Sequence, residues 1–179
     1  MSEIDTAAFR EMIRVNHAGE YGAKRIYQGQ LSQLPPGEDA DRIQHMADQE
    51  GEHLAAFEEW MIKHRVRPSL LLPFWHVGGF AMGAVTALLG REAAYACTVA
   101  VESVIDEHYA EQEIALAEAS ESDATLRALR DTVTTFRAEE MEHHDMSIEQ
   151  GALNAPAYPL LSGIVQGITR TAILLAKKI

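Results

Sequence analysis

The sequence repeats one arrangement twice: a segment with a single glutamate, followed by a segment with a glutamate and a histidine. Two segments contain Glu-x-x-His, at Glu50 to His53 and at Glu140 to His143. Each is preceded by a segment with one glutamate in a small-residue or apolar setting, Glu20 in NHAGEYGA and Glu102 in ACTVAVESVI. On an α-helix, residues three positions apart share a face, so each motif can offer one carboxylate and one imidazole to a single ion. The repeat therefore requires a fold in which helices bring these four segments together.

Helical spacing of apolar residues runs through nearly the whole sequence, and proline, glycine and short polar runs interrupt it. The predicted helices cover residues 6–34, 39–64, 91–119, 124–151 and 160–178. SESDAT and LNAPAYP are interpreted as joints between the later helices. Hydrophobic residues make up 47% of the chain and aromatic residues only 7%, which favours helices over strands. We predict one all-α domain over residues 1–179.

Two antiparallel helix pairs with this pattern predict a four-helix bundle with metal ligands in its core. Two single-glutamate helices and two Glu-x-x-His helices supply the ligand set of ferritin-like di-iron and di-manganese bundles. The predicted ligands are Glu20, Glu50, His53, Glu102, Glu140 and His143. Their four carboxylates neutralise two divalent ions, whereas without metal they are like charges in a low dielectric. Cys97 is the only cysteine, which excludes a cysteine-rich zinc or iron–sulfur site and favours iron or manganese.

Other residues near the motifs have two readings each. A single Glu-x-x-His is usually a solvated helix face, and the second copy with its preceding glutamates makes the metal reading stronger. Asp106 is a candidate to orient a ligand histidine, with an ordinary surface aspartate as the alternative. His108 and Tyr109 are candidates for a substrate pocket, with an exposed histidine and a core tyrosine as the alternative. The remaining charged residues of the motifs are interpreted as solvated: Glu52, Glu139, Glu142 and His144.

Two segments are apolar beyond what a bundle core requires. Residues 68–90 contain no Asp, Glu, Lys or Arg, but Pro73, His76 and several glycines argue against a simple membrane span. A single crossing there would also place the two halves of the metal site on opposite sides of the membrane. Residues 160–178 are apolar apart from Arg170 and two terminal lysines. We predict that both segments form membrane-facing additions to the bundle, with cover of the core or a subunit interface as the alternative.

The net charge of −12 argues against a nucleic-acid partner, because phosphate binding requires a basic surface. The stretch MSEIDTAAF carries acidic residues and lacks an apolar signal core, so no secretion signal is expected. The single cysteine fits a reducing compartment.

The motifs HAGEYGA, RVRP, GFAMGAVTALLG, ACTVAVE, EEMEHHD and APAY, in that order, resemble the demethoxyubiquinone hydroxylase family of ubiquinone biosynthesis. The resemblance covers the chain from about Ile13 onward and implies a ferritin-like bundle holding two iron ions on the six ligands above. It implies hydroxylation of a 2-polyprenyl-3-methyl-6-methoxy-benzoquinol with O2 to the 5-hydroxy product. It also implies peripheral attachment to the cytoplasmic face of a bacterial inner membrane, or to the matrix side of the mitochondrial inner membrane, and a lipid-presenting partner protein. Glu107 stands where family members often have histidine, which concerns only the outer pocket.

Two other readings compete with this one. Another ferritin-like di-iron protein, a ferroxidase or a peroxidase, would share the ligands, although a rubrerythrin-like peroxidase needs further cysteines. A non-catalytic, lipid-binding membrane adaptor would instead have solvated acidic clusters. The chain carries no nucleotide-binding glycine fingerprint, so electrons are expected from an external donor, NADH or a reductase.

Overall fold

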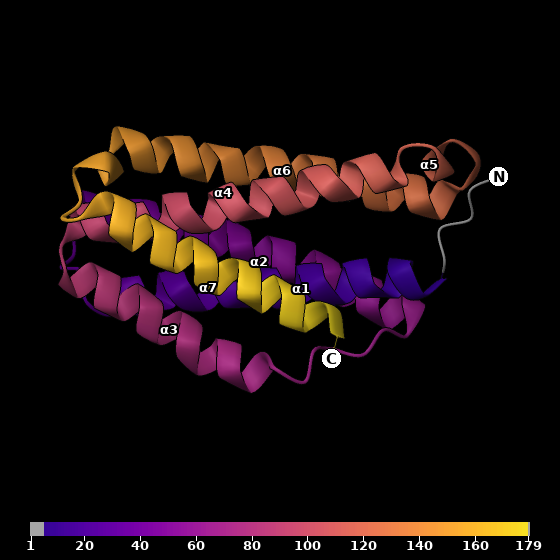
Figure 1. The fold of residues 1–179 in the computed structure, drawn as a ribbon, viewed down its shortest axis with the longest axis horizontal. Helices are drawn as coiled ribbons and strands as arrows, with labels where there is room; N and C mark the ends of the chain where they lie inside the picture. Colours follow the sequence, from indigo (N-terminus) through magenta and orange to yellow (C-terminus); the bar gives the residue numbers. More distant parts are fainter. Residues whose placement is uncertain (1–5, 179) are drawn as a thin grey trace.

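The computed structural model describes residues 6–178, and within that range the fold is entirely helical (Figure 1). The predicted all-α class is therefore confirmed. The elements in chain order are α1 (Thr6–Leu31), α2 (Glu38–His64), α3 (Leu72–Leu88), α4 (Arg91–Leu116), α5 (Ala119–Ser122), α6 (Ala124–Glu149), the 3-10 helix η1 (Ala152–Asn154) and α7 (Tyr158–Lys178).

Four long helices form the bundle as two antiparallel pairs, α1 with α2 and α4 with α6, and α3 and α7 lie on one side of it (Figure 1). The helix ends follow ordinary capping chemistry. Asp123 accepts hydrogen bonds from the backbone amides of Thr125 and Leu126 and starts α6. Acidic residues occupy the first turn of α2 and basic residues its last turn, which complements the helix dipole. The two pairs present their apolar faces to each other, as the sequence pattern predicts.

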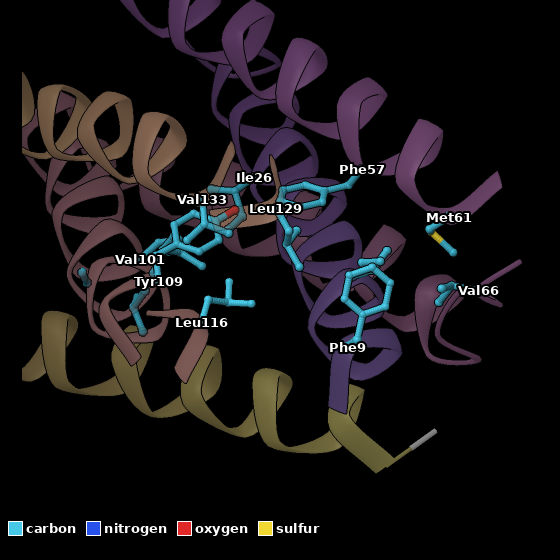
Figure 2. Packing of buried hydrophobic residues seen from close by; sticks show 14 of the residues in the cluster. Phe9, Ile26, Phe57, Met61, Val66, Val101, Tyr109, Leu116, Leu129 and Val133 are labelled. Carbon is cyan, nitrogen blue, oxygen red and sulfur yellow. The ribbon is translucent and has the colours of Figure 1, made fainter. Parts of the chain in front are cut away.

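The main core lies between these pairs, and Figure 2 shows it from close by. Phe9 and Ile26 of α1, Phe57 of α2, Tyr109 of α4 and Leu129 of α6 are among its buried side chains. Burial of such side chains stabilises the bundle by about 1.5–3 kcal/mol each. The metal ligands predicted above lie on the same inward faces, so core packing also fixes the positions of these polar groups.

Helices α1 and α3 pack with their backbones in contact. A Cβ atom at Gly83 would lie 1.9 Å from the carbonyl oxygen of Ile26, and one at Gly29 would lie 2.1 Å from the carbonyl oxygen of Phe80. No side chain larger than hydrogen fits at such a distance, so glycine is required at both positions. The contact holds α3 against the helix that carries Glu20.

The outer sides of α3 and α7 expose large apolar residues, and we call this surface the apolar face. Leu70, just before α3, is 77% exposed and Phe74 is 69% exposed. Its other members are Val77, Val85 and Leu88 of α3 and Leu160, Ile164, Ile168, Leu174 and Leu175 of α7. Within residues 6–178, α7 is the one helix long and apolar enough to cross a membrane by length and composition, and α3 is shorter. Arg170, on α7, is paired with Glu107 of α4.

The largest errors in the predicted boundaries are at the ends of two helices. The helix predicted to continue to residue 119 ends at Leu116, and α5 occupies part of the expected polar joint because Ala119 and Ser120 are buried against the bundle. The first helix ends at Leu31 rather than residue 34, in a turn where the amides of Gln33 and Leu34 both donate to the carbonyl of Gln30. The two prolines that follow cannot continue the helix.

Candidate metal centre

The structure brings together all six residues predicted as ligands, each from the helix that the repeat assigned to it. Glu20 lies on α1, Glu50 and His53 on α2, Glu102 on α4, and Glu140 and His143 on α6. None is more than 4% exposed. They form two overlapping groups whose ligand atoms lie within 4.8 Å of one another, and both groups contain Glu50 and Glu140. The first group adds Glu20 and His53 and the second adds Glu102 and His143. Glu50 and Glu140 are thus common to both groups, whereas Glu20 and Glu102 each belong to one group, and we call this second pair the terminal glutamates.

Both histidines turn the same ring nitrogen toward the carboxylates. His53 Nδ1 lies 3.1 Å from Glu140 and 3.6 Å from Glu20. His143 Nδ1 lies 3.2 Å from Glu140 and 3.4 Å from Glu50. The carboxylate closest to each Nδ1 atom is thus that of Glu140, which belongs to both groups.

The carboxylates are short of partners within the protein. Both oxygens of Glu50 and the Oε2 atom of Glu102 are buried without a hydrogen bond. Burial raises the pKa of Glu50 and Glu102, and the neighbouring carboxylates, Glu140 first, raise both further. Buried polar atoms left without partners are costly, and cations would satisfy these oxygens. The donor set therefore fits two divalent ions.

The two histidines offset part of this charge. Burial opposes ionisation of Glu140, but hydrogen bonds from His143 and His53 outweigh it and lower the pKa of Glu140 to about 2. Burial likewise opposes charge on His53, but its hydrogen bonds with Glu140 and Glu20 raise the pKa of His53 to about 11. A divalent ion bound at Nδ1 would replace the proton there and supply the positive charge itself.

Two tyrosines hold the terminal carboxylates from outside. Tyr27 of α1 donates a hydrogen bond of 2.8 Å to Glu102 of α4, and Tyr109 of α4 donates to Glu20 of α1. Each tyrosine follows a ligand glutamate by two helical turns, Glu20 and Glu102 respectively, and reaches the carboxylate of the other helix. Sequence reasoning overlooked Tyr27, although its spacing from Glu20 repeats the spacing of Tyr109 from Glu102.

The outer nitrogens of the histidines also have partners across the bundle. His53 Nε2 lies 2.6 Å from Glu139 of α6, and His143 Nε2 lies 3.0 Å from Gln49 of α2. Glu139 was predicted to be solvated, but its side chain is only 36% exposed and contacts a ligand. Such partners fix the orientation of metal-binding histidines.

The remaining site candidates lie farther from the carboxylates. Asp106, predicted to orient a histidine, instead accepts a 2.7 Å hydrogen bond from Arg137. His108 is buried beside Gln112, which donates to its Nε2 at 2.7 Å, and burial lowers the pKa of His108 to about 4. It lines a separate cavity of about 190 Å³ with Lys177. Cys97, the single cysteine, is fully buried.

An apolar cavity of about 250 Å³ lies beside the carboxylates, between α1, α3, α4 and α7. Its wall includes Gly19 and Val101, the chain neighbours of Glu20 and Glu102. Thr169 is the polar side chain among an otherwise apolar lining that includes Trp75. A narrower gap shares part of this wall and ends at Glu102. An apolar ring in the cavity would thus lie next to the predicted metal positions, shielded from water.

Comparison with known proteins agrees with this geometry. The sequence model of the family described as "Ubiquinone biosynthesis protein COQ7" matches residues 7–176. The chain belongs to the COQ7 family. The match covers all four bundle helices and both helices of the apolar face, so the family assignment applies to the whole described fold.

Curated members of the COQ7 family align with nearly all of this chain. The human protein named "NADPH-dependent 3-demethoxyubiquinone 3-hydroxylase, mitochondrial" is 48% identical over 179 residues, which is 100% of this chain and 82% of the human protein. The "3-demethoxyubiquinol 3-hydroxylase" of Rhodospirillum rubrum is 45% identical over 97% of this chain and 79% of its own length. The "5-demethoxyubiquinone hydroxylase, mitochondrial" of Saccharomyces cerevisiae is 39% identical, with 82% of its length covered.

Proposed function

We propose that this member of the COQ7 family is a di-iron monooxygenase that hydroxylates the ring of demethoxyubiquinol with O2 to the 5-hydroxy product. The observation that carries the proposal is a buried set of four carboxylates and two imidazoles beside an apolar cavity. Family membership and the printed names of the relatives support the reaction class. The ligands we assign are those of the two groups described above: Glu20, Glu50, His53, Glu102, Glu140 and His143.

The reaction sets what the site must supply. A ring C–H bond becomes a C–OH bond with one oxygen atom of O2, and the other oxygen leaves as water after taking up two electrons and two protons. When bound, two iron ions would supply the redox chemistry with O2 that side-chain acids and bases cannot. The electrons come from an external donor, for which we propose a reduced nicotinamide nucleotide acting directly or through a reductase. The "NADPH-dependent" name of the human relative supports this choice of donor.

The protein residues position the substrate and exclude water. The cavity admits an apolar ring against Val101 and Ile105 of α4, while Trp75 and Phe74 of α3 border it on the outer side. The pocket volume lies just below the roughly 300–1,000 Å³ typical of small-molecule sites, which suits a single ring. The isoprenoid tail then leaves between α3 and α7, where the apolar face begins.

We further propose that the apolar face lies on the membrane that holds the substrate. Exposed Leu70 and Phe74 and the outer side of α7 would enter the lipid. Arg10 near the start of α1 and Arg65 and Arg67 in the segment between α2 and α3 line one depression, and no ion pair involves them within residues 6–178. They are placed to meet anionic headgroups. The surface corresponds to peripheral attachment at a bacterial inner membrane or the mitochondrial inner membrane, and a lipid-presenting protein could dock beside it.

Turnover by purified protein tests the reaction. Iron-loaded protein is incubated with a short-tailed demethoxyubiquinol, O2 and NADPH with and without a reductase, and the hydroxylated quinone is measured by mass spectrometry. Product should disappear in Glu102→Ala and Glu140→Ala, while Glu142→Ala, at an exposed position of α6, should keep wild-type turnover. Folded wild-type protein that binds two iron ions per chain yet forms no product would refute the proposal. Protein that binds no iron would favour the adaptor reading.

Partitioning onto vesicles tests the membrane surface separately. Leu70→Glu and Ile114→Glu place the same charge at two positions that are each 77% exposed, but only Leu70 belongs to the apolar face. We expect Leu70→Glu to lower sedimentation with vesicles containing anionic lipid, and Ile114→Glu to leave it unchanged. Equal behaviour of the two variants would contradict the assigned orientation.

A further inference from the structure

Four residues hydrogen-bond to the ligands from outside, and they form two pairs that occupy equivalent places in the repeat. The members of one pair are identical, whereas the members of the other pair differ in charge. Tyr27 and Tyr109 both offer a phenol to the terminal glutamates. Gln49 and Glu139 occupy the same position of the repeat, directly before the ligand glutamate of each Glu-x-x-His motif. One of them is a neutral amide and the other is a carboxylate. The two ion positions therefore have matching ligands but different surroundings.

Glu139 fixes the tautomer of His53. Its Oε2 atom lies 2.6 Å from His53 Nε2, and an ionised carboxylate can only accept a hydrogen bond. Nε2 must then carry the proton, which leaves Nδ1, the nitrogen that faces Glu20 and Glu140, to bind an ion. The negative partner also makes the imidazole a stronger electron donor to the ion.

Gln49 acts on His143 more weakly. Its Oε1 atom lies 3.0 Å from His143 Nε2, a longer contact without a charge. An amide can turn over and present its NH2 group instead, so it does not dictate which ring nitrogen holds the proton. The ring of His143 lies nearly perpendicular to the ring of Tyr27, at 6.3 Å between centroids. The ring of His53, in contrast, is stacked on Phe136 at 4.0 Å, which holds its plane.

We propose that Glu139 is a positioning residue that makes the ion position at His53 bind Fe(II) more tightly than the position at His143. The inference rests on the di-iron centre proposed above. The first Fe(II) to bind enters the group of Glu20, Glu50, His53 and Glu140, and the second completes the centre at Glu102 and His143. Outer partners of ligand histidines typically change metal affinity by about 10- to 100-fold, so the two binding steps are separated by a factor of this order.

Three variants of the pair test the proposal by anaerobic titration of Fe(II) against a competing chelator. Glu139→Gln gives both histidines amide partners, and Gln49→Glu gives both carboxylate partners, so each single change should bring the two steps together. The first should weaken the tighter step by about 10- to 100-fold, and the second should strengthen the weaker step. The double variant, Gln49→Glu with Glu139→Gln, should separate the steps again. Glu142→Gln, at an exposed position of α6, controls for the loss of one charge and should leave both steps unchanged.

Mössbauer spectra of protein loaded with one equivalent of ⁵⁷Fe(II) identify the position that fills first. The wild type should give one quadrupole doublet, and the double variant should give a different one, because the ion moves to the position at His143. The role of Glu139 would be overturned if the two Fe(II)-binding steps were equally separated in all variants. It would also be overturned if Glu142→Gln changed the two Fe(II) affinities as much as Glu139→Gln does. If Glu139→Gln does not fold, Gln49→Glu, which keeps Glu139, still decides, because it should bring the two steps together. Wild-type protein that binds fewer than two Fe(II) ions would instead overturn the di-iron centre itself.

Discussion

Replacing Gly83 by alanine would separate α3 from α1, and the structure allows the cost to be worked out. The new Cβ atom would lie 1.9 Å from the carbonyl oxygen of Ile26, 2.8 Å from its carbonyl carbon and 3.0 Å from the amide nitrogen of Gln30. All three are backbone atoms, so no side chain can turn away and the helices must move apart. Overpacking costs about 1–3 kcal/mol and occasionally more, and a contact this short belongs at the upper end. Removing a helical glycine returns roughly 0.8–1.0 kcal/mol.

The expected net loss is therefore about 2 kcal/mol of unfolding free energy, or a Tm lower by about 4–8 °C for a chain of this length. Gly78→Ala is the matched control on the same helix, because a Cβ atom there has nothing within 4 Å. It should stabilise the protein by up to about 1 kcal/mol through helix propensity. Thermal and urea unfolding of the metal-loaded wild type and both variants, all in the same detergent, measures the two stability changes.

The same variant should also affect the cavity. Helices α1 and α3 form two of its walls, so their separation should weaken binding of a ubiquinone analogue followed through Trp75 fluorescence. If the Gly83→Ala variant is as stable as the Gly78→Ala variant, the backbone contact between α1 and α3 is refuted. Normal analogue binding in a destabilised Gly83→Ala protein would show that this contact does not shape the cavity.

Further predictions concern the metal centre. Tyr27→Phe keeps the ring but removes the hydrogen bond to Glu102, so a chelator should remove iron from this variant about 10-fold faster than from the wild type. Equal rates of iron loss from the variant and the wild type would contradict the role of the phenol. Metal-free protein should lose stability as the pH rises. The raised pKa of Glu50 gives stability that declines above about pH 4.3, and the pKa of about 11 at His53 gives stability that is complete below about pH 6.5 and declines toward pH 11. Glu140, with its pKa lowered to about 2, gives stability that declines only below about pH 4.3. Bound metal should remove the decline at high pH, because it takes the place of these protons, and Tm measured at pH 5, 7 and 9 with and without metal checks this.

The clustering of the six candidate ligands could be predicted because it follows from helix geometry and from the repeat of the motif. A spacing of three residues places Glu50 and His53 on one face whatever the helix packs against, and the second copy of the motif confirmed the register. Prolines and glycines located most helix ends for a similarly local reason, since they change the backbone at the position where they occur.

The partners of the ligands could not be predicted from the sequence because they belong to other helices. The contact of Glu139 with His53 depends on the rotation and offset of α6 relative to α2. Asp106 does lie on the expected side of α4, but Arg137 of α6 reaches it and forms an ion pair. The buried joint at α5 likewise depends on tertiary packing rather than on its polar sequence.

The crossed hydrogen bonds have a consequence for how the protein assembles. Each half of the chain completes the ligand surroundings of the other: Tyr27 supports Glu102, Tyr109 supports Glu20, and the histidine partners cross in the same way. Neither half alone could form a finished centre. Two fragments divided in the loop before Arg91 should bind iron tightly only as a complex, so metal uptake would report their complementation.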